Sequence, residues 1–537
     1  MELDLMIRNG LVFDGLGNPP RQLDVGIRGD RTVWMGRGGE HSARQILQAD
    51  GLFVTPGFID MHSHGDMLCF MDGKIRRAKI AQGITTDLSG QCGIGPAPIQ
   101  PGMEAWRQFV APVIGNPGTA GWNWPGFGDF LYEAETRGTP HNIAYLVAHG
   151  AVRASVLGLE SGIARGRDLE NMQELLRQSL SQGAFGMSFG LSYLPGMFAD
   201  PVEIQALAKV LAAHDRILMV HIRSHSLEMR EAVEEMIGTA RKTGVRLHIS
   251  HLKSYRNRRY GLEGSVLREM VESAAQDVDI TFDEHPYLAG STTLSQLLPP
   301  WAREGGAPAM TGRIRDRQSR DRLLGELSDP GFTVPGWDNY WGIAGWDRII
   351  ISSVEKDHNR WMENQSLPDV ARRMGTTVQG ALLEILEDEG SSSCMVIRDL
   401  FSDDDLITLM QSPLAMVGSD GIPTGTPHPR MFGTFPVFLR KLVREHRALT
   451  WEDAISRITG KSAARLGLQH RGLIREGYMA DLVIFDPETL DAPEDYSRPE
   501  EPPRGIREVV VNGVTAGSGN ESGRILRALP AENGMEE

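Results

Sequence analysis

The chain has 537 residues, of which 41% are hydrophobic and 23% are charged, and its formal net charge at pH 7 is -15. This length is enough for a large core and more than one domain, and the composition is that of an ordinary globular protein. The acidic balance argues against nucleic acid or an anionic membrane as the main partner, because both bind basic surfaces.

Targeting signals and cysteines bear on the compartment. The N-terminus, Met-Glu-Leu-Asp-Leu-Met-Ile-Arg, lacks the basic start and the apolar run of a signal peptide. No apolar run approaches the roughly 18 residues that a membrane-spanning helix needs. The three cysteines, Cys69, Cys92 and Cys394, cannot form a disulfide framework and suit a reducing compartment. We therefore expect a cytoplasmic protein with no membrane partner.

The two ends of the chain are predicted to be rich in short β-strands. Residues 3–13 have the pattern of a hairpin with Asn9-Gly10 as its turn, and residues 24–36 repeat that pattern. Short strands return at residues 477–486 and 506–513, the latter ending in a second Asn-Gly pair. We expect residues 1–54 and 471–520 to form one small β-sandwich or β-barrel domain. Residues 521–537 are predicted to be a loosely ordered polar tail.

Between about residues 55 and 470, short apolar runs alternate with segments of helical periodicity. One such segment, residues 201–214, is apolar at Ile204, Leu207, Val210 and Leu211, which is typical of a helix. The alternation predicts an α/β protein with a (β/α)8 barrel of the TIM type. An open doubly wound sheet is less favoured, because no Gly-x-Gly-x-x-Gly follows an early strand. The eight predicted strands are residues 58–62, 84–89, 143–148, 184–188, 217–221, 246–250, 278–282 and 414–418.

The stretch between the seventh and eighth predicted strands is too long for a single helix. It includes a segment rich in Gly, Pro and Trp and an apolar run at residues 348–354 that predicts an extra strand. We therefore expect an inserted subdomain at about residues 290–345, before the last barrel strand. Its place in the chain is that of a lid over the strand ends.

Side chains that bind metals or carry out catalysis follow several of these strands directly. In a barrel, the catalytic groups lie at the C-terminal ends of the strands. His62 and His64 are two residues apart, so on a strand they point to the same side and can bind one divalent metal. The other strand ends offer Cys92, His149, His221, His251 and Asp420. Their convergence at one end of the predicted barrel indicates a metal site.

Taken singly, each of these residues has an ordinary structural explanation. A lone cysteine such as Cys92 is more often a small buried thiol. An aspartate beside glycine, as at Asp420, is more often a turn residue. Lone histidines are more often core residues, and for His149 we expect a structural hydrogen bond. Three further histidines are weaker candidates for function, namely His225, His248 and His285.

The combined pattern resembles the amidohydrolase superfamily of metal-dependent hydrolases. That pattern is His-x-His after the first strand, histidines after the fifth and sixth, and an aspartate after the eighth. Many members carry a carboxylated lysine after the fourth strand, but residues 183–196 contain no lysine here, and Cys92 is the substitute. This detail resembles the N-acyl-D-amino-acid deacylase (D-aminoacylase) family. The resemblance runs nearly end to end and includes residues 83–93, 221–223, 248–253, 286–292, 418–421 and 428–430.

This resemblance implies a zinc-dependent hydrolase that cleaves the amide bond of small-molecule N-acyl-D-amino acids. It implies one zinc held tightly by Cys92, His221 and His251. A second, weaker position would be bordered by His62, His64 and Asp420, and Asp420 would take the proton of water and pass it to the leaving amine. The implied substrate-binding residues are Lys253 and Tyr287 at the carboxylate, Arg430 as a further candidate there, and Tyr193 and Ser291 along the pocket.

Three positions depart from the family pattern. Ser224-His225-Ser226 stands where the family usually has an acidic residue, Gln91 replaces the usual Asn before the cysteine, and Leu252 stands where relatives often have a second histidine. These positions are expected near the pocket, so the preference for acyl group and amino-acid side chain stays open.

Three alternatives to a D-amino-acid deacylase fit parts of the sequence pattern. A hydantoinase-like hydrolase of cyclic amides normally has the lysine that is absent here. A non-catalytic barrel that serves as a scaffold would be expected to lose ligands, whereas all six expected ligand positions are filled. An ordinary (β/α)8 enzyme with structural histidines would not gather these side chains at its strand ends. We make no prediction of the oligomeric state.

Overall fold

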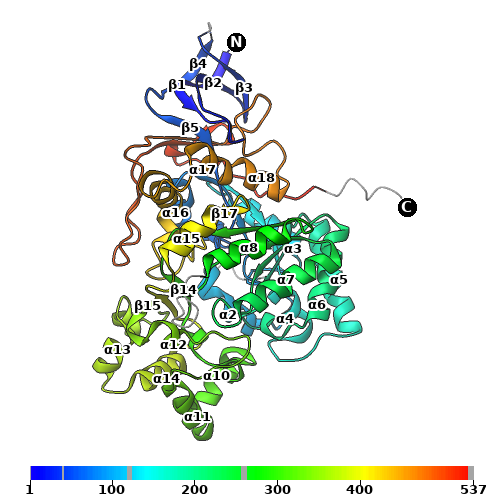
Figure 1. Ribbon diagram of the computed structural model, residues 1–537. Coiled ribbons are helices and arrows are strands. Elements are labelled where there is room, and N and C mark those ends of the chain that lie inside the picture. The colour runs from blue at the N-terminus through cyan, green and yellow to red at the C-terminus, as the bar shows by residue number, and fades with distance from the viewer. Residues whose placement is uncertain (1, 39–40, 118–121, 123, 256–262, 530–537) are drawn as a thin grey trace.

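The structure is a computed structural model that describes residues 2–38, 41–117, 122, 124–255 and 263–529. It has three parts. In Figure 1, a β-sheet made by both chain ends lies at the top, parallel strands with their helices lie in the middle, and an inserted region lies at the bottom. No helix in the described part of the chain combines the length and the apolar character that crossing a membrane requires.

Both ends of the chain contribute to one β-sheet. Its strand order is β20-β19-β18-β5-β1-β2-β3, and β4 pairs with β1. The ends meet where β18 runs antiparallel to β5, with Val483 opposite Thr55. The strands are β1 (Glu2–Val12), β2 (Arg21–Arg28), β3 (Arg31–Gly36), β4 (Ser42–Gln48), β5 (Phe53–Pro56), β18 (Leu482–Phe485), β19 (Ile506–Val511) and β20 (Val514–Thr515).

The predicted hairpin turn at Asn9-Gly10 is wrong. Strand β1 continues through both residues, and its register with β2 shifts between Ile7 and Gly10, which marks a bulge. Asn9 adopts the left-handed conformation that the sequence pair favours, with φ 57°. The second Asn-Gly pair does form a turn, because Asn512 and Gly513 both have positive φ and connect β19 to β20.

In the described part of the chain, nine parallel strands form the middle of the molecule. They run from β6 to β13 and end with β17, and each strand pairs with the one before it in this order. The exception is the step from β8 to β9, which are separated along the chain only by Leu146 and do not pair with each other. The first and last also meet, because the Met61 amide donates to the Val417 carbonyl at 3.1 Å. The strands are β6 (Phe58–Asp60), β7 (Ile84–Ser89), β8 (Asn142–Tyr145), β9 (Val147–Ala148), β10 (Gly186–Gly190), β11 (Ile217–His221), β12 (Arg246–Ile249), β13 (Ile280–Glu284) and β17 (Ala415–Val417).

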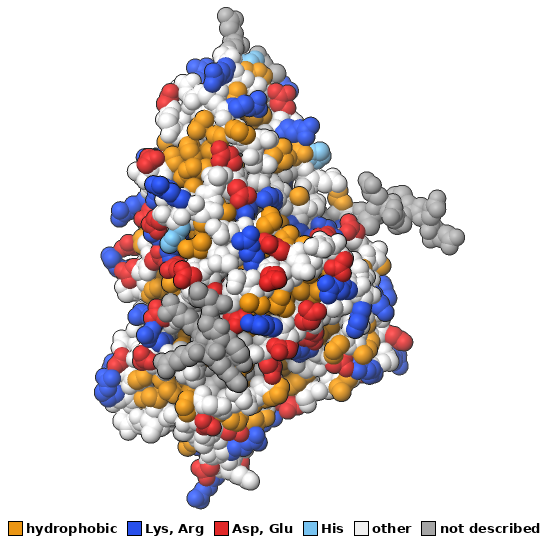
Figure 2. All heavy atoms as spheres, in the orientation of Figure 1, with side chains coloured by type: hydrophobic (Ala, Val, Ile, Leu, Met, Phe, Trp, Pro, Cys, Tyr) orange, Lys and Arg blue, Asp and Glu red, His pale blue; other side chains and the backbone are white. Residues whose placement is uncertain are grey.

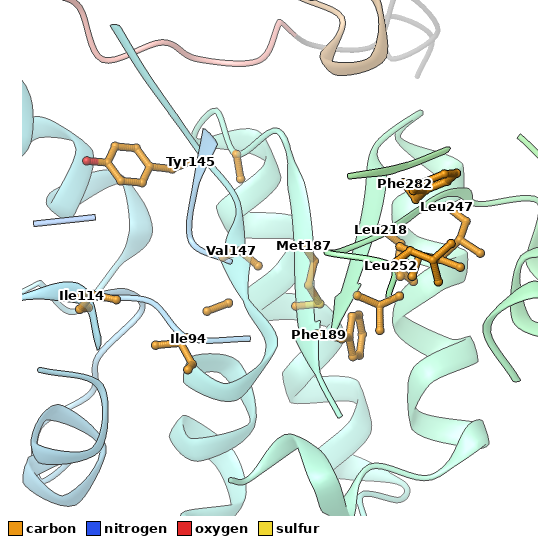
Figure 3. Packing of buried hydrophobic residues seen from close by; sticks show 14 of the residues in the cluster. Ile94, Ile114, Tyr145, Val147, Met187, Phe189, Leu218, Leu247, Leu252 and Phe282 are labelled. Carbon is orange, nitrogen blue, oxygen red and sulfur yellow. The ribbon is translucent and has the colours of Figure 1, made fainter. Parts of the chain in front are cut away.

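The two faces of these strands pack into different clusters, as strand alternation requires. On β11, Leu218 and Val220 belong to the large cluster shared with the helices, whereas Ile217 and Met219 belong to an inner cluster with Leu88. Figure 3 shows part of the large cluster, to which successive strands contribute Val147, Met187, Leu218, Leu247 and Phe282. His221 ends β11 and continues the inner face.

Helices follow most of these strands. Helix α6 begins after Asp200, whose carboxylate accepts from the amides of Val202 and Glu203, with Pro201 at its first position. The helices outside the inserted region are α1 (Ala78–Ala81), α2 (Glu104–Ile114), α3 (Phe127–Arg137), α4 (His149–Leu157), α5 (Arg167–Ser181), α6 (Pro201–Ala213), α7 (Met229–Thr243), α8 (Gly264–Ala274), α15 (Asp403–Met410), α16 (Arg430–Phe438), α17 (Trp451–Arg457) and α18 (Gly460–Leu466).

The inserted region is larger than the predicted residues 290–345. Its antiparallel sheet pairs Gly290 with Ile397, and its separate hydrophobic cluster extends to Phe401. Residues 367–389 have ordinary helical periodicity, so the pattern alone did not assign them to this region. Its elements are β14 (Gly290–Thr293), β15 (Ile349–Ser353), β16 (Cys394–Ile397), α9 (Pro300–Arg303), α10 (Gly306–Arg315), α11 (Arg317–Ser328), α12 (Tyr340–Ala344), α13 (Leu367–Met374) and α14 (Val378–Glu389).

The start of the predicted loose tail is held against the parallel strands. The amide of Leu526 donates to the Ile143 carbonyl at 2.8 Å, and the amide of Ala528 donates to the Gly183 carbonyl at 2.9 Å. Composition could not reveal this, because main-chain groups make these bonds. The rest of the predicted tail, residues 530–537, lies outside the described residues. Figure 2 shows acidic and basic side chains interspersed over one face of the molecule.

Candidate metal centre

The predicted metal ligands meet at the C-terminal ends of the parallel strands. Six side chains reach this point from five strand ends, and each residue is at most 8% exposed. Two groups of three can each hold a metal ion: His62, His64 and Cys92 form one, and Cys92, His221 and His251 form the other. Cys92 belongs to both groups and therefore lies between them.

Distances around the Cys92 sulfur define the centre. Its Sγ is 3.3 Å from His62 Nε2, 3.5 Å from His251 Nε2 and 3.7 Å from His221 Nδ1. The two nitrogens of His221 and His251 are 2.9 Å apart. Donor atoms around a tetrahedral zinc, bound at about 2.0–2.3 Å, lie roughly 3.3–3.8 Å from one another. The three sulfur–nitrogen distances fall in this range, whereas the His221–His251 distance is shorter and would have to widen by a few tenths of an ångström. Thiolate and imidazole are also the donor types that zinc prefers, so the donor set fits zinc.

Asp420 adds a carboxylate on the other side of the histidine pair. Its Oδ1 is 3.3 Å from His64 Nε2 and 3.5 Å from His62 Nε2. Its Oδ2 is 2.9 Å from a nitrogen of Arg430, which is 1% exposed. Arg430 is therefore a buried partner of Asp420 and not a solvated loop charge.

The electrostatics of the site favour metal ligation. Burial alone would raise the pKa of the Cys92 thiol, but His62, His221 and His64 outweigh it and lower that pKa well below the ordinary value. A thiolate is the form that binds zinc. Burial lowers the pKa of His221 and His251 to about 3, so both imidazoles are neutral and have a free lone pair.

The second histidine pair differs. Burial disfavours the charged form of His64, but hydrogen bonds with Asp420 and Cys92 outweigh burial and raise its pKa to about 9. Burial likewise would raise the pKa of Asp420, but Arg430 and His64 lower it well below the ordinary value.

Three of the six residues have strained backbones. Cys92, His251 and Asp420 have φ of 55°, 36° and 50°, in the left-handed region that side chains other than glycine rarely adopt. Each lies in the loop that follows a strand, within three residues of the strand end. At Gly190, an added Cβ would lie 1.9 Å from the Cys92 carbonyl oxygen, so glycine is required for this close approach. Such strain is common where a site fixes its side chains.

A cavity opens beside these residues. Its lining includes four of the five predicted substrate-binding residues, Tyr193, Lys253, Ser291 and Arg430. Tyr287, the fifth predicted substrate-binding residue, is not among the residues that line this cavity. Its buried hydroxyl has no hydrogen-bond partner, and its ring packs against His428 with centroids 5.1 Å apart.

Comparison with known proteins decides the family. A model described as the amidohydrolase family matches residues 45–327 and 398–516. A D-aminoacylase of Alcaligenes xylosoxydans xylosoxydans is 30% identical over 98% of both chains. An N-acyl-D-glutamate deacylase of the same organism is 31% identical, over 98% of this chain and 97% of that protein. The chain belongs to the amidohydrolase family. Within that family it is a member of the D-aminoacylase group.

A solved structure supports the assignment of this chain to the D-aminoacylase group. The N-acyl-D-glutamate deacylase of Bordetella bronchiseptica, complexed with zinc and a phosphonate that mimics the tetrahedral intermediate, superposes with a TM-score of 0.83. It is 29% identical, and the match covers 98% of this chain and 100% of that one. The fold is therefore of the TIM-barrel type found in this group.

The sequence did not reveal the role of the carboxylate at the end of β13. Asp283, at the end of β13, lies 3.4 Å from His62 Nδ1 and 2.9 Å from His248 Nε2. A carboxylate behind a histidine ligand fixes its orientation. The signal was an Asp-Glu pair ending a buried strand, where charged residues need a partner. His248 thus has a structural role, as does His149, whose Nε2 lies 2.7 Å from Glu203 Oε1.

A second missed carboxylate comes from the inserted region of this amidohydrolase. Asp338 accepts hydrogen bonds from the Ser224 hydroxyl at 2.6 Å and from the His225 amide at 2.9 Å. The loop after β11 lacks the usual acidic residue, and Asp338 supplies one from 113 residues further along the chain. The ring of His225 then packs against His221 and His251, with centroids 4.9 and 5.2 Å apart.

His285, only a weaker candidate from the sequence, contacts two residues of the cavity lining. Its Nε2 accepts from Lys253 Nζ at 2.7 Å and from Arg430 at 3.2 Å. It therefore holds together the two cations that line the cavity. The other departures from the family pattern have local explanations. Gln91 donates to the Met61 carbonyl at 3.0 Å, and Leu252 is fully buried in the large hydrophobic cluster.

Proposed function

We propose that the chain is a zinc-dependent hydrolase that cleaves N-acyl-D-amino acids into a carboxylate and a free D-amino acid. The observation that carries the proposal is the convergence of Cys92, His221 and His251 beside Asp420 and a cavity containing two cations. The near-full-length identity of about 30% to a D-aminoacylase supports the substrate class.

The parallel strands are proposed to form a closed (β/α)8 barrel that extends from about residue 55 to 470. The hydrogen bond from Met61 to Val417 and the bridge between Ser63 and Gly421 support closure between the first and last strands. Residues 1–54 and 471–520 would form the small β-domain. The inserted region is proposed to be a separate subdomain from about residue 290 to 400.

Zinc is proposed to bind in two places. Cys92, His221 and His251 would hold the tight ion, since thiolate and neutral imidazole suit zinc. His62, His64 and Asp420 would border a weaker second position. Zinc, when bound, supplies a Lewis acid that polarises the amide carbonyl and lowers the pKa of water. The free state of all three cysteines in the structure supports a reducing, cytoplasmic location.

Asp420 is proposed to move the proton. It takes a proton from water as the water oxygen joins the acyl carbon, and it returns that proton to nitrogen as the carbon–nitrogen bond breaks. Arg430, at 2.9 Å, fixes one carboxylate oxygen and leaves the other directed at the histidines. Lys253 and Arg430 would bind the α-carboxylate, while Tyr193 and Ser291 line the pocket.

A chiral substrate panel on metal-analysed protein tests this function. N-acetyl-D-amino acids, their L-isomers and cyclic amides are compared at equal zinc content. We expect hydrolysis of D-substrates at least about a hundredfold faster than of L-substrates, because a pocket that orients three substituents discriminates their mirror arrangement. Preferential hydrolysis of cyclic amides would establish a hydantoinase-like enzyme instead. Zinc binding without any hydrolysis would favour a scaffold.

A further inference from the structure

The side chain of the D-amino acid is the open property of the proposed substrate. Overall identity does not determine it, because the relative named for D-glutamate and the D-aminoacylase are 31% and 30% identical to this chain. The cavity beside the metal centre has two distinct walls that carry more information.

One wall comes from the inserted region and from the loop after β12, to which Tyr255 belongs. It consists of Tyr255, Tyr340, Ile397, Leu400 and Phe401. Its rings contact one another, with Tyr255 centroids 5.5 Å from Tyr340 and 5.7 Å from Phe401. Tyr255 and Tyr340 also share a hydrogen bond between their hydroxyls at 3.3 Å. This wall therefore presents mainly carbon to the cavity.

Lys253 connects this wall to the proposed carboxylate site. Its Nζ lies 4.3 Å from the centroid of the Phe401 ring. In an amino acid, the carboxylate and the side chain are both bonded to Cα. A carboxylate bound at Lys253 therefore places the side chain close to that cation, on the part of the cavity that Phe401 lines.

Other apolar residues of the lining form a second wall. It consists of Ile94, Phe109, Val113 and Ile422, and two of these residues follow Cys92 and Asp420 by two positions. The scissile carbonyl must reach these ligands, and the acyl chain extends from that carbonyl away from Cα. The acyl group is thus directed toward this second wall.

Charge on the cavity lining limits the side chain further. Among the described lining residues, Lys253 and Arg430 are the cations. Arg430 is paired with Asp420 at 2.9 Å, and Lys253 with Glu284 at 3.2 Å. A substrate with two carboxylates would have to leave one unpaired in a buried site. Arg303 is buried nearby with two unpartnered nitrogens, but it does not line the cavity and donates to Gln296.

We infer that this enzyme selects N-acyl-D-amino acids with uncharged, apolar side chains. The wall of Leu400 and Phe401 receives the side chain, and the wall of Phe109 and Val113 receives the acyl group. The inference rests on the proposed function, because it assigns the parts of the same substrate to the two walls.

The first experiment compares kcat/KM for the N-acetyl derivatives of D-leucine and D-phenylalanine with those of D-glutamate and D-aspartate. We expect the apolar substrates to be preferred by at least about a hundredfold, since an unpaired buried carboxylate is costly. Preference for an acidic substrate overturns the inference but leaves the proposed function intact. Failure to hydrolyse any D-substrate refutes the proposed function itself.

The second experiment separates the two walls with matched variants, Leu400→Ala and Val113→Ala. Both remove aliphatic carbon from buried positions, one on each wall. Leu400→Ala should change the ratio of kcat/KM between D-leucine and D-alanine substrates by about tenfold or more. It should have little effect on the ratio of kcat/KM between N-acetyl and N-butanoyl substrates. Val113→Ala should change the ratio for the acyl groups and leave the ratio for the side chains nearly unchanged. These ratios are measured on one preparation, so partial unfolding does not affect them.

The assignment of the walls would be overturned if Leu400→Ala changed the acyl-group ratio or if Val113→Ala changed the side-chain ratio. Arg303→Gln completes the test. Arg303 is a buried cation with two nitrogens that have no hydrogen-bond partner, so it is the alternative partner for a second carboxylate. We expect the ratio between D-leucine and D-glutamate substrates to stay within about threefold of wild type in this variant. Loss of a preference for D-glutamate in Arg303→Gln would instead assign an acidic subsite to Arg303.

Discussion

Cys92 is the residue on which both groups of metal-binding side chains depend. It lies 3.3 Å from His62 and 3.5 Å from His251, and its backbone is held in the left-handed region. One sulfur thus contacts both histidine pairs, which is the position that a bridging lysine has in other amidohydrolases. Loss of this sulfur should affect metal content before it affects folding.

Cys92→Ala is predicted to lower zinc affinity more than mutation of a residue that only hydrogen-bonds to a metal ligand, which costs ~10–100-fold. The reason is that Cys92→Ala removes a proposed ligand itself. Metal analysis after dialysis measures the effect. Cys69→Ala is the matched control, since Cys69 is equally buried and free but belongs to neither group of metal-binding side chains. Full zinc occupancy in Cys92→Ala would show that Cys92 is not a ligand.

Asp420→Asn is predicted to keep the fold and the tight zinc but to lose about 10²–10⁴-fold in kcat, because an amide cannot take a proton from water. The amide oxygen still accepts from Arg430, which limits the cost in stability. Steady-state kinetics on zinc-loaded protein measure the loss. A suitable comparison is Asp405→Asn, whose carboxylate accepts from the Gly264 amide away from the site. Near-normal turnover in Asp420→Asn would refute its role.

The residues at the strand ends were predictable because ligands of one metal share a chemistry and a position on the fold. Cys92, His221 and His251 each follow an apolar run, and that order is visible in the sequence. Asp338 and His285 were not predictable in the same way. Their partners lie on other elements, and no local periodicity indicates which distant carboxylate will complete a loop.

At the scale of elements, the inserted region is joined to the metal centre by one carboxylate. Asp338 binds the loop after β11, and His225 on that loop packs against two proposed zinc ligands. The insertion is therefore connected to His221 and His251 through Asp338 and His225. Burial raises the pKa of Asp338 to about 6, so it is less easily ionised in the folded protein than in the unfolded chain.

Asp338→Asn is predicted to remove a pH-dependent loss of stability. Because the folded pKa is raised, the contribution of Asp338 to the free energy of unfolding falls as pH rises from about 4 to 6, by about 3 kcal/mol. Urea unfolding at several pH values measures this slope. Asn can retain both hydrogen bonds, since the Ser224 hydroxyl can accept from its amide. An unchanged slope would exclude ionisation of Asp338 as its source.

Helices and strands were predicted correctly where the spacing of apolar residues matched one type of element. The parallel strands alternate with amphipathic helices such as α6, and their order follows from that pattern. The prediction failed where local and tertiary signals conflicted. Asn9-Gly10 has the residues of a turn, but β1 pairs with β2 again from Gly10 and with β5 just beyond it, so the strand continues. The limits of the insertion depend on Gly290 pairing with Ile397, which is a contact remote in sequence.

At the scale of the whole molecule, a buried polar cluster joins the small β-sheet to the parallel strands. Asp481 forms an ion pair with Arg471 and accepts from the Asn512 amide at 2.8 Å. The side chain of Asn512 donates to Asn142 on β8 at 2.8 Å. The side chains of Asp481 and Arg471 are 5% and 7% exposed, so neither charge is solvated.

Asp481→Ala is predicted to reduce the free energy of unfolding by about 3–5 kcal/mol, because it leaves a buried guanidinium without its partner. Urea or thermal unfolding measures the loss. Asp357→Ala is the control, because its ion pair with Arg360 is exposed and should contribute less than about 1 kcal/mol. Equal effects of the two changes would show that the buried cluster does not stabilise the junction.

The contact between the first and last parallel strands has a consequence for biosynthesis. His62 and Asp420 become neighbours when β6 and β17 meet, as the bond from the Asp420 amide to the His62 carbonyl at 2.7 Å records. Synthesis proceeds from the N-terminus, so Cys92, His221 and His251 leave the ribosome well before Asp420. The nascent chain acquires its proposed zinc ligands before its proton carrier. The proposed proton carrier therefore reaches the site only when the last parallel strand pairs with the first.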